Sequence, residues 1–249
     1  MSMAESNERV AIVTGGGTGL GRAMAIALAS DGTDVVVNFS RSEGEAAETA
    51  AVIREMGRRA KVVRADVAVE AQVASMVREA MNEFGQIDYL IINAGTTVFC
   101  DLSNLDGITE SDWDRILGVN VKGAWFCAKH AAPHMKERGG HIVTISSTAG
   151  LMTMGSSIPY CVSKAGLLHL TRMLARALAP EIQVNSIAPG LLDTRWGRHH
   201  GEAGIAAYVE RSLLHRIPSL DDICAQLLVL LRSRSTTGQT VVMDGGLTV

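Results

Sequence analysis

The chain has 249 residues, of which 47% are hydrophobic and 20% charged, a balance typical of a globular protein. This length suffices for one large domain with a hydrophobic core or for two small domains. The formal net charge of −3 at pH 7 gives no reason to expect nucleic acid or an anionic membrane surface as a partner.

The sequence also argues against a membrane or secreted protein. No apolar run reaches the roughly 18 residues of a membrane-spanning helix, and the opening stretch MSMAESNERV lacks the basic and apolar regions of a secretory signal. The cysteines are scattered without paired spacing, so neither a disulfide framework nor a zinc site is expected; they are Cys100, Cys127, Cys161 and Cys224. We therefore expect a cytoplasmic protein that holds no metal.

Short runs rich in valine and isoleucine alternate with longer stretches of helical spacing. Strands are expected at 10–15, 34–39, 60–67, 88–93, 141–146, 182–188 and 240–244. Helices are expected within 24–30, 48–57, 73–85, 113–137, 165–179 and 224–232. Strand runs that are apolar on both faces are typical of a parallel sheet covered on both sides. The alternation predicts a single domain spanning 1–249, a doubly wound α/β sheet without repeat or linker.

The stretch TGGGTGLGR (14–22) lies directly between the first strand and the first helix. An α/β sheet receives phosphate at this place, because helix N–H groups favour an anion and glycines allow the backbone to approach it. A P-loop is disfavoured, since Arg22 and Ala23 stand where lysine and serine or threonine are required. The usual GxGxxG also fails, because Leu20 and Arg22 fall where the closing glycine belongs. The pattern that the loop does match is TGxxxGxG, formed by Thr14, Gly15, Gly19 and Gly21.

The end of the second strand bears on the choice of dinucleotide. An NAD-binding fold usually places a carboxylate there, some 20 residues after the glycine loop, for the ribose 2′-hydroxyl. Here the chain reads Asn38-Phe39-Ser40-Arg41-Ser42, without a carboxylate. The Arg41 guanidinium suits a phosphate by charge and by fork geometry. This favours NADP, although NAD is not excluded.

The stretch YCVSK places Tyr160 and Lys164 four residues apart, on one face of a helix that Pro159 helps to start. A free tyrosine has a pKa of about 10. A nearby cation stabilises the phenolate and lowers that pKa, which would make the phenol a usable acid–base group. A single YxxxK pair also occurs by chance on protein surfaces.

In combination the motifs are more specific. TGGGTGLG, Asp66, Asn93-Ala94-Gly95, Asn120, Ser147, the Tyr160–Lys164 pair and Pro189-Gly190 resemble the short-chain dehydrogenase/reductase family in order and spacing. The resemblance extends from about residue 8 to TGQTVVMDGG (237–246). It implies a Rossmann-type sheet of seven parallel strands and a nicotinamide dinucleotide as cofactor.

The resemblance also implies a role for each site residue. Tyr160 passes a proton to or from the substrate oxygen, and Ser147 hydrogen-bonds that oxygen. Lys164 lowers the pKa of the tyrosine and holds the nicotinamide ribose, while Asn120 anchors a water that links Lys164 to solvent. The implied cofactor-binding residues are Gly15, Thr18, Gly19, Leu20, Gly21, Phe39, Ser40, Arg41, Ser42, Asp66, Val67, Asn93, Ala94, Gly95, Tyr160, Lys164, Pro189, Gly190, Leu192 and Thr194.

The sequence departs from the family pattern at two positions. Ile92 replaces the first asparagine of NNAG, and Thr18 stands where many NADP-dependent members carry arginine or lysine, which weakens the NADP prediction. The family carries its variable substrate lid at 191–217, where Trp196, His199 and His200 are candidates for substrate contact.

We expect an NADP(H)-dependent oxidoreductase acting on a small ketone or secondary alcohol. One alternative is a β-ketoacyl-acyl-carrier-protein reductase, whose docking arginines are matched by Arg138 but opposed by Glu181. The other alternative is a regulator that binds a dinucleotide without catalysing a reaction. The presence of Ser147, Tyr160 and Lys164 argues against this alternative. The family also implies a homotetramer, built through helices at 112–137 and 159–179 and through 220–244.

Overall fold

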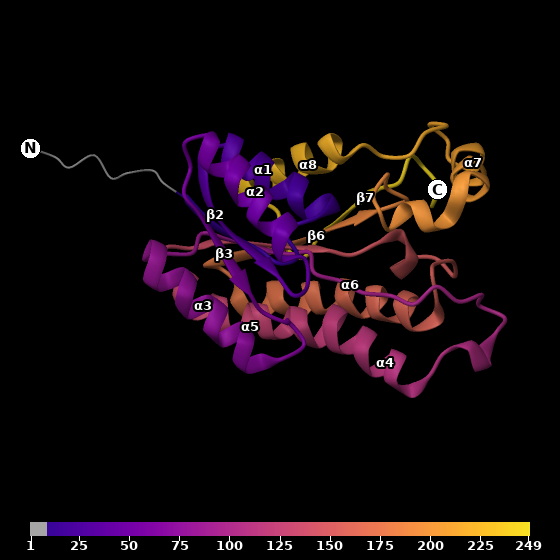
Figure 1. The fold of residues 1–249 in the computed structure, drawn as a ribbon, viewed down its shortest axis with the longest axis horizontal. Helices are drawn as coiled ribbons and strands as arrows, with labels where there is room; N and C mark the ends of the chain where they lie inside the picture. The colour runs from indigo at the N-terminus through magenta and orange to yellow at the C-terminus, as the bar shows by residue number, and fades with distance from the viewer. Residues whose placement is uncertain (1–8) are drawn as a thin grey trace, which may run out of the picture.

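The computed structural model describes residues 9–249. A parallel sheet of seven strands in the order β3-β2-β1-β4-β5-β6-β7 runs through it (Figure 1). The strands are β1 (Arg9–Val13), β2 (Thr33–Phe39), β3 (Ala60–Arg64), β4 (Tyr89–Ile92), β5 (Gly140–Ile145), β6 (Ile182–Pro189) and β7 (Thr240–Met243). The predicted doubly wound α/β domain is confirmed.

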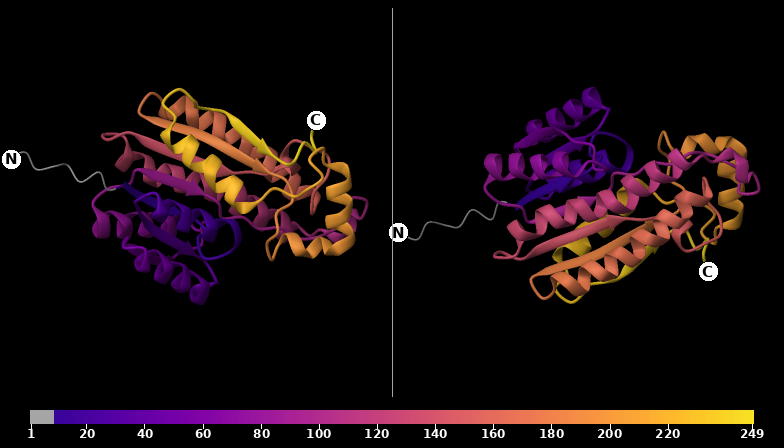
Figure 2. Two further views of the ribbon diagram at one scale, coloured as in Figure 1. Left: turned by 90° about the horizontal axis from the view of Figure 1, so that it is seen from above. Right: turned by 90° about the horizontal axis from the view of Figure 1, so that it is seen from below.

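Helices cover both faces of the sheet (Figure 1). On one face α1 (Gly19–Ser30) packs between α2 (Glu43–Glu55) and α8 (Leu220–Arg232). On the other face α5 (Ala124–Met135) packs between α3 (Glu70–Phe84) and α6 (Ile158–Leu178), and α4 (Glu110–Leu117) contacts α6. Figure 2 shows α7 (Gly201–Arg211) at one end of the molecule, beside the C-terminus.

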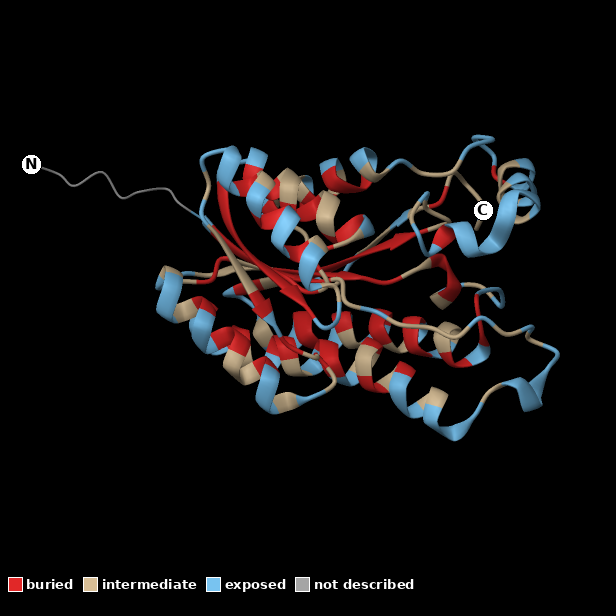
Figure 3. Cartoon of the chain, in the orientation of Figure 1, coloured by how far each residue is buried: buried red, intermediate tan, exposed pale blue. Residues whose placement is uncertain are grey.

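The apolar character of the central strands follows from this double cover. Side chains alternate between the two faces of a strand, so Ile12 packs into the core on the α3, α5 and α6 side while Val13 packs into the core on the α1 and α8 side. Both side chains are fully buried, and Figure 3 shows the buried residues concentrated along the sheet. No position in β1 beyond its first residue faces water, which explains why the strand shows no polar alternation.

The structure departs from the expected elements in three places. The helix expected over 113–137 is divided by a π-helical turn at Gly118–Gly123. The strand expected to reach residue 67 ends at Arg64, and the Asp66 carboxylate then accepts a hydrogen bond from the Ala68 N–H, which forms a local turn. Helix α7 was not expected, because GEAGIAAYVER holds two glycines of low helix propensity.

The strand order fixes where a ligand can bind. Both β2 and β4 pair with β1, so the chain reverses direction across the sheet at this point. A crevice forms outside the carboxyl ends of the strands at such a reversal. Among residues 9–249 no helix combines the length and apolarity needed to cross a membrane.

Candidate active site

A cavity of about 800 Å³ opens at the carboxyl ends of the central strands. It is lined by every residue of the predicted cofactor-binding set and by the predicted catalytic residue Ser147. Of the predicted site residues, Asn120 alone is not part of its wall. Positions scattered between residues 15 and 194 are thus brought to one site.

The glycine loop adopts a backbone that side chains would prevent. Gly15 and Gly19 have φ of +63° and +52°, a region that favours glycine. A Cβ on Gly21 would overlap the carbonyl oxygen of Gly15. The loop and the first turn of α1 therefore form a cradle of bare backbone, which answers why the sequence concentrates glycine here.

Three polar side chains hold this loop from behind. The Thr14 hydroxyl donates to the Ile91 carbonyl and accepts from the N–H groups of Asn93 and Ala94, at 2.9 and 3.0 Å. The Asn93 amide in turn donates to the carbonyls of Thr14 and Gly15. From the other side, the buried Asn38 side chain accepts from the Gly15 N–H at 3.2 Å and donates to the Ala65 carbonyl.

The start of α1 has the chemistry that a diphosphate requires. The helix begins after Thr18, whose side chain caps none of the free N–H groups, and its first turn holds no acidic residue. The free N–H groups and the positive end of the helix dipole therefore face the cavity without a compensating charge. The cradle and its donors fit the diphosphate of a dinucleotide.

The far end of the cavity fits an adenosine. Phe39 to Ser42 line it at the end of β2, and Asp66 and Val67 line it after β3. Arg41 is exposed there, and within residues 9–249 it forms no ion pair. No carboxylate occupies the end of β2, as the sequence indicated.

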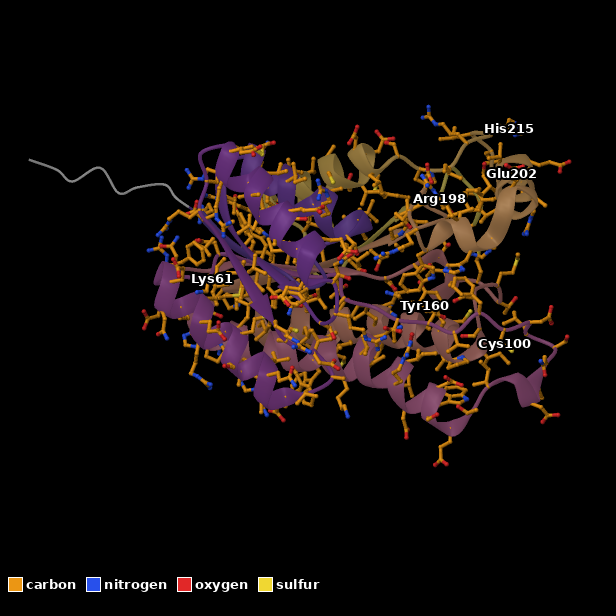
Figure 4. The ribbon with its side chains drawn as sticks, viewed as in Figure 1. Lys61, Cys100, Tyr160, Arg198, Glu202 and His215 are labelled. Carbon is orange, nitrogen blue, oxygen red and sulfur yellow. The ribbon has the colours of Figure 1, made fainter. Side chains whose placement is uncertain are left out.

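The predicted catalytic side chains meet beside β5. Lys164 is buried, and its Nζ donates to the Ile145 carbonyl at 2.8 Å and lies 5.7 Å from the centroid of the Tyr160 ring. Figure 4 shows Tyr160 on α6, at the same end of the molecule as Arg198 and Glu202. The Ser147 hydroxyl lies near enough to the Tyr160 phenol to influence its pKa, and it accepts a hydrogen bond from the Ala149 N–H at 3.1 Å.

The protonation states differ from the expectation for this pair. Burial raises the pKa of Tyr160 to about 12, and the Ser147 side chain opposes this only in part. Burial also lowers the pKa of Lys164 to about 8. The pKa of Tyr160 is raised and not lowered because burial outweighs the other influences on it, while Lys164 Nζ donates to the Ile145 carbonyl. In the protein alone, the phenol at neutral pH is a proton donor.

Ser146 and Ser147 have different surroundings. The Ser146 hydroxyl is buried and donates to the Lys164 carbonyl at 2.9 Å, which ties α6 to the end of β5. Ser147 instead presents its hydroxyl to the phenol. The structure thus places Ser147, and not Ser146, next to Tyr160, in agreement with the expected register.

Asn120 does not line the cavity but is hydrogen-bonded to two segments that do. It lies in the π-helical turn, a feature common at functional sites, and its side chain pairs with both the N–H and the carbonyl of Thr96. Its amide also donates to Ser163 Oγ, which donates to the Tyr160 carbonyl. Asn120 therefore joins the loop after β4 to the catalytic turn of α6.

Segment 191–217 closes one side of the cavity. The Trp196 ring lies 5.7 Å from the Tyr160 ring, and the Thr194 hydroxyl accepts from the Gly197 N–H. Both His199 and His200 pack on Phe99, but only His200 lines the cavity. These contacts bring Trp196 and His200, two of the three candidates for substrate contact, to the site.

Some lining residues carried no recognisable signal in the sequence. Tyr208 on α7 donates to the Asp244 carbonyl at 2.6 Å and contacts the cavity, as do Met152, Met154, Arg211 and Leu247. Each comes from a loop or from α7, where periodicity identifies no buried face. Asn38 also lines the cavity, and the sequence did give a signal for it, because it is a polar residue inside the apolar run DVVVNF.

The chain is similar to known proteins in sequence and in structure. Residues 15–248 match a family model described as enoyl-(acyl carrier protein) reductase. The chain is 40% identical over 240 residues to a putative ketoacyl reductase of granaticin polyketide synthase from Streptomyces violaceoruber, covering 95% of each. It is 32% identical to the 3-oxoacyl-[acyl-carrier-protein] reductase FabG of Staphylococcus epidermidis, covering 95% of this chain and 98% of that one. A putative short-chain alcohol dehydrogenase from Sinorhizobium meliloti superposes with a TM-score of 0.89 at 36% identity, covering 96% of both chains.

The two neighbouring serines give a matched pair of variants. Ser147→Ala removes the hydroxyl beside the phenol, and we expect kcat to fall by about 10²-fold, the range for loss of one hydrogen bond that stabilises developing charge. Ser146→Ala removes a buried hydrogen bond remote from the reacting oxygen and should cost much less activity. Steady-state kinetics with both variants check this, and the opposite order would show that the register is wrong.

The protonation of Lys164 predicts a pH dependence. Because burial places its pKa near 8, the ammonium is present below that pH and is lost as the pH rises through it. The phenol, with its pKa of about 12, stays protonated over the same range. We expect kcat/KM for the cofactor to be level below about pH 8 and to fall above it, since this constant reports ionisations of the free enzyme. In Lys164→Arg the residual activity should lose this fall, because a guanidinium keeps its charge; a level wild-type profile up to about pH 10 would contradict the assignment.

Proposed function

This chain belongs to the short-chain dehydrogenase/reductase family, and we propose that it interconverts a small ketone and a secondary alcohol with NADP(H). Members of the family are oxidoreductases of CH–OH groups that use a nicotinamide dinucleotide. The observation that carries the proposal is the position of the Tyr160 phenol and Ser147 on the wall of one cavity, which also includes the glycine cradle, with the phenol protonated at neutral pH.

The bound dinucleotide supplies or accepts the hydride. In the direction of reduction, Tyr160 gives its proton to the substrate oxygen, and its high pKa suits donation to an alkoxide. The Ser147 hydroxyl hydrogen-bonds that oxygen as negative charge develops on it. Lys164 would hold the nicotinamide ribose. Asn120 fixes the turn of α6 that carries Tyr160, and it would anchor a water between Lys164 and solvent. Thr194 would contact the carboxamide of the same ring.

The test of this function is Tyr160→Phe. The substitution removes the proton donor and keeps the ring that packs near Trp196. We expect turnover of ketones from a diketone panel to fall by at least about 10²-fold, the range for loss of a general acid, with cofactor affinity retained. NADPH absorbance measures the turnover. Activity within about twofold of wild type would contradict the role of Tyr160.

The preference for NADP is supported by Arg41. It lies exposed at the adenosine end of the cavity, free of any ion pair within residues 9–249, where a 2′-phosphate would reach it. Thr18, the residue that weakens the prediction, lines the same cavity at the start of α1.

A double variant tests the cofactor preference. Phe39→Asp with Arg41→Ala adds a carboxylate that repels the 2′-phosphate and deletes the cation that attracts it. We expect kcat/KM to favour NADPH in the wild type and NADH in the double variant. Equal values for both cofactors in the wild type would refute the preference.

A β-ketoacyl-acyl-carrier-protein reductase is the second candidate, favoured by the names of two relatives. An acidic carrier protein needs a basic docking surface. Arg138 and Glu181 lie close together at the amino ends of β5 and β6, since Gly140 N–H donates to the Glu181 carbonyl. Glu181 therefore lies at the same edge of the sheet as the one matching arginine, and its negative charge there opposes an acidic partner.

The two substrate classes are separated by a direct comparison. We expect acetoacetyl groups to be reduced as well from a free ester as from acyl carrier protein, because the docking patch is incomplete. The measurement is kcat/KM for both forms. A value at least about tenfold higher for the carrier-bound form, equivalent to about 1.4 kcal/mol, would restore the fatty-acid function.

The remaining proposals concern regulation, assembly and location. A regulator without catalysis is disfavoured because Ser147, Tyr160 and Lys164 are all present and gathered at one cavity. A homotetramer is supported by apolar side chains exposed on α5, α6 and α8, namely Trp125, Val162, Met173 and Val229.

All four cysteines lie in the described part of the chain and are free, which supports a reducing compartment such as the cytoplasm. We also assign segment 191–217 as the substrate lid.

A further inference from the structure

Arg211 stands out among the charged residues of the lid. It is the last residue of α7, it is exposed, and it lines the cavity at the end formed by Tyr208, Met154 and Gly155. Among the described residues, the sulfur of Met154 is its one hydrogen-bond acceptor, at 3.3 Å. A thioether is a weak acceptor, so the guanidinium keeps most of its donor capacity.

Most of the other arginines of the lid and of the cavity wall have partners, and Arg216, also in the lid, does not line the cavity. Arg195 pairs with Glu45, and Arg198 pairs with Asp193. On the cavity wall, Arg115 donates to the Thr96 hydroxyl at 2.7 Å. Arg41 lies at the adenosine end, where the 2′-phosphate is proposed. Within residues 9–249 no ion pair involves Arg211.

The cavity wall that includes Arg211 and Tyr160 also carries apolar side chains. Met152, Trp196 and Leu247 are among its lining residues, together with Ala207 one turn before Arg211 on α7. A substrate with its carbonyl at Tyr160 would place an apolar body against these side chains. Any anionic group at its far end would meet the Arg211 guanidinium.

We propose that Arg211 is a substrate-binding residue for a carboxylate, so that the preferred substrate is a keto acid, or the corresponding hydroxy acid, with an apolar body between its carbonyl and its carboxylate. This proposal rests on the proposed function and narrows its substrate class. The planar guanidinium can hold a carboxylate through two parallel hydrogen bonds, which a neutral ketone cannot offer.

The experiment compares binding of 4-acetylbenzoate and of its methyl ester, two probes that carry an aromatic ring between the carbonyl and the varied group and that differ in the charge of that group. Isothermal titration calorimetry in the presence of saturating NADP⁺ gives Kd without turnover. We expect the wild type to bind the acid at least about tenfold more tightly than the ester. Arg211→Gln should reduce this ratio to about one, and Arg211→Lys should restore part of it, because an ammonium keeps the charge but not the fork.

Arg198→Gln is the matched control, since it removes the same charge from the same lid but at a residue outside the cavity wall. It should leave the ratio of affinities unchanged. A wild-type ratio of one or below, no binding of either probe, or an unchanged ratio in Arg211→Gln would overturn the carboxylate site. Reduction of neutral diketones with NADPH distinguishes the causes, because it persists if only this inference fails and is absent if the proposed function fails.

Discussion

The hydrogen bonds of Thr14, Asn38 and Asn93 to the glycine loop are the constraint on which the rest of the site depends. The loop holds residues in the left-handed region and a glycine pressed against a carbonyl, so its own conformation costs entropy and contributes little packing. Thr14 and Asn93 attach it to β4, and Asn38 attaches it to β2 and to the chain after β3. The same three side chains thus set the loop, the NAG segment and the adenosine end relative to one another.

Burial also sets the protonation states of Tyr160 and Lys164. Sequence spacing puts a cation one helical turn from a phenol, and the simple expectation is a lowered tyrosine pKa. In the structure both groups are buried, and burial favours the neutral form of each. The result is a phenol that keeps its proton and a lysine that loses its charge near pH 8. Desolvation is the largest influence on the pKa of both groups, and Lys164 Nζ donates its hydrogen bond to the Ile145 carbonyl.

The substrate end is held together by the last residues of the chain. The buried Asp244 side chain accepts from the N–H groups of Gly246 and Thr248, while its carbonyl accepts from Tyr208. The Tyr208 hydroxyl lies so close to Gly190 that any side chain there would overlap it. The lid helix, the end of β6 and the C-terminal turn therefore form one wall, which carries Leu247 and Arg211 into the cavity.

The sequence by itself determined the fold class, the seven strands and a set of predicted cofactor-binding residues that the structure gathers at one cavity. It could do so because apolar runs report burial on both faces, and because TGxxxGxG, NAG and YxxxK are local patterns that each occupy a few consecutive residues. It determined neither helix α7 nor the partner of Arg211, since both depend on contacts between residues far apart in the chain. Only the tertiary structure decided that Asn120 stands behind the cavity wall and that Tyr160 keeps its proton. Side-chain direction and desolvation depend on neighbouring residues that folding brings together from distant parts of the chain. Such neighbours leave no local pattern in the sequence.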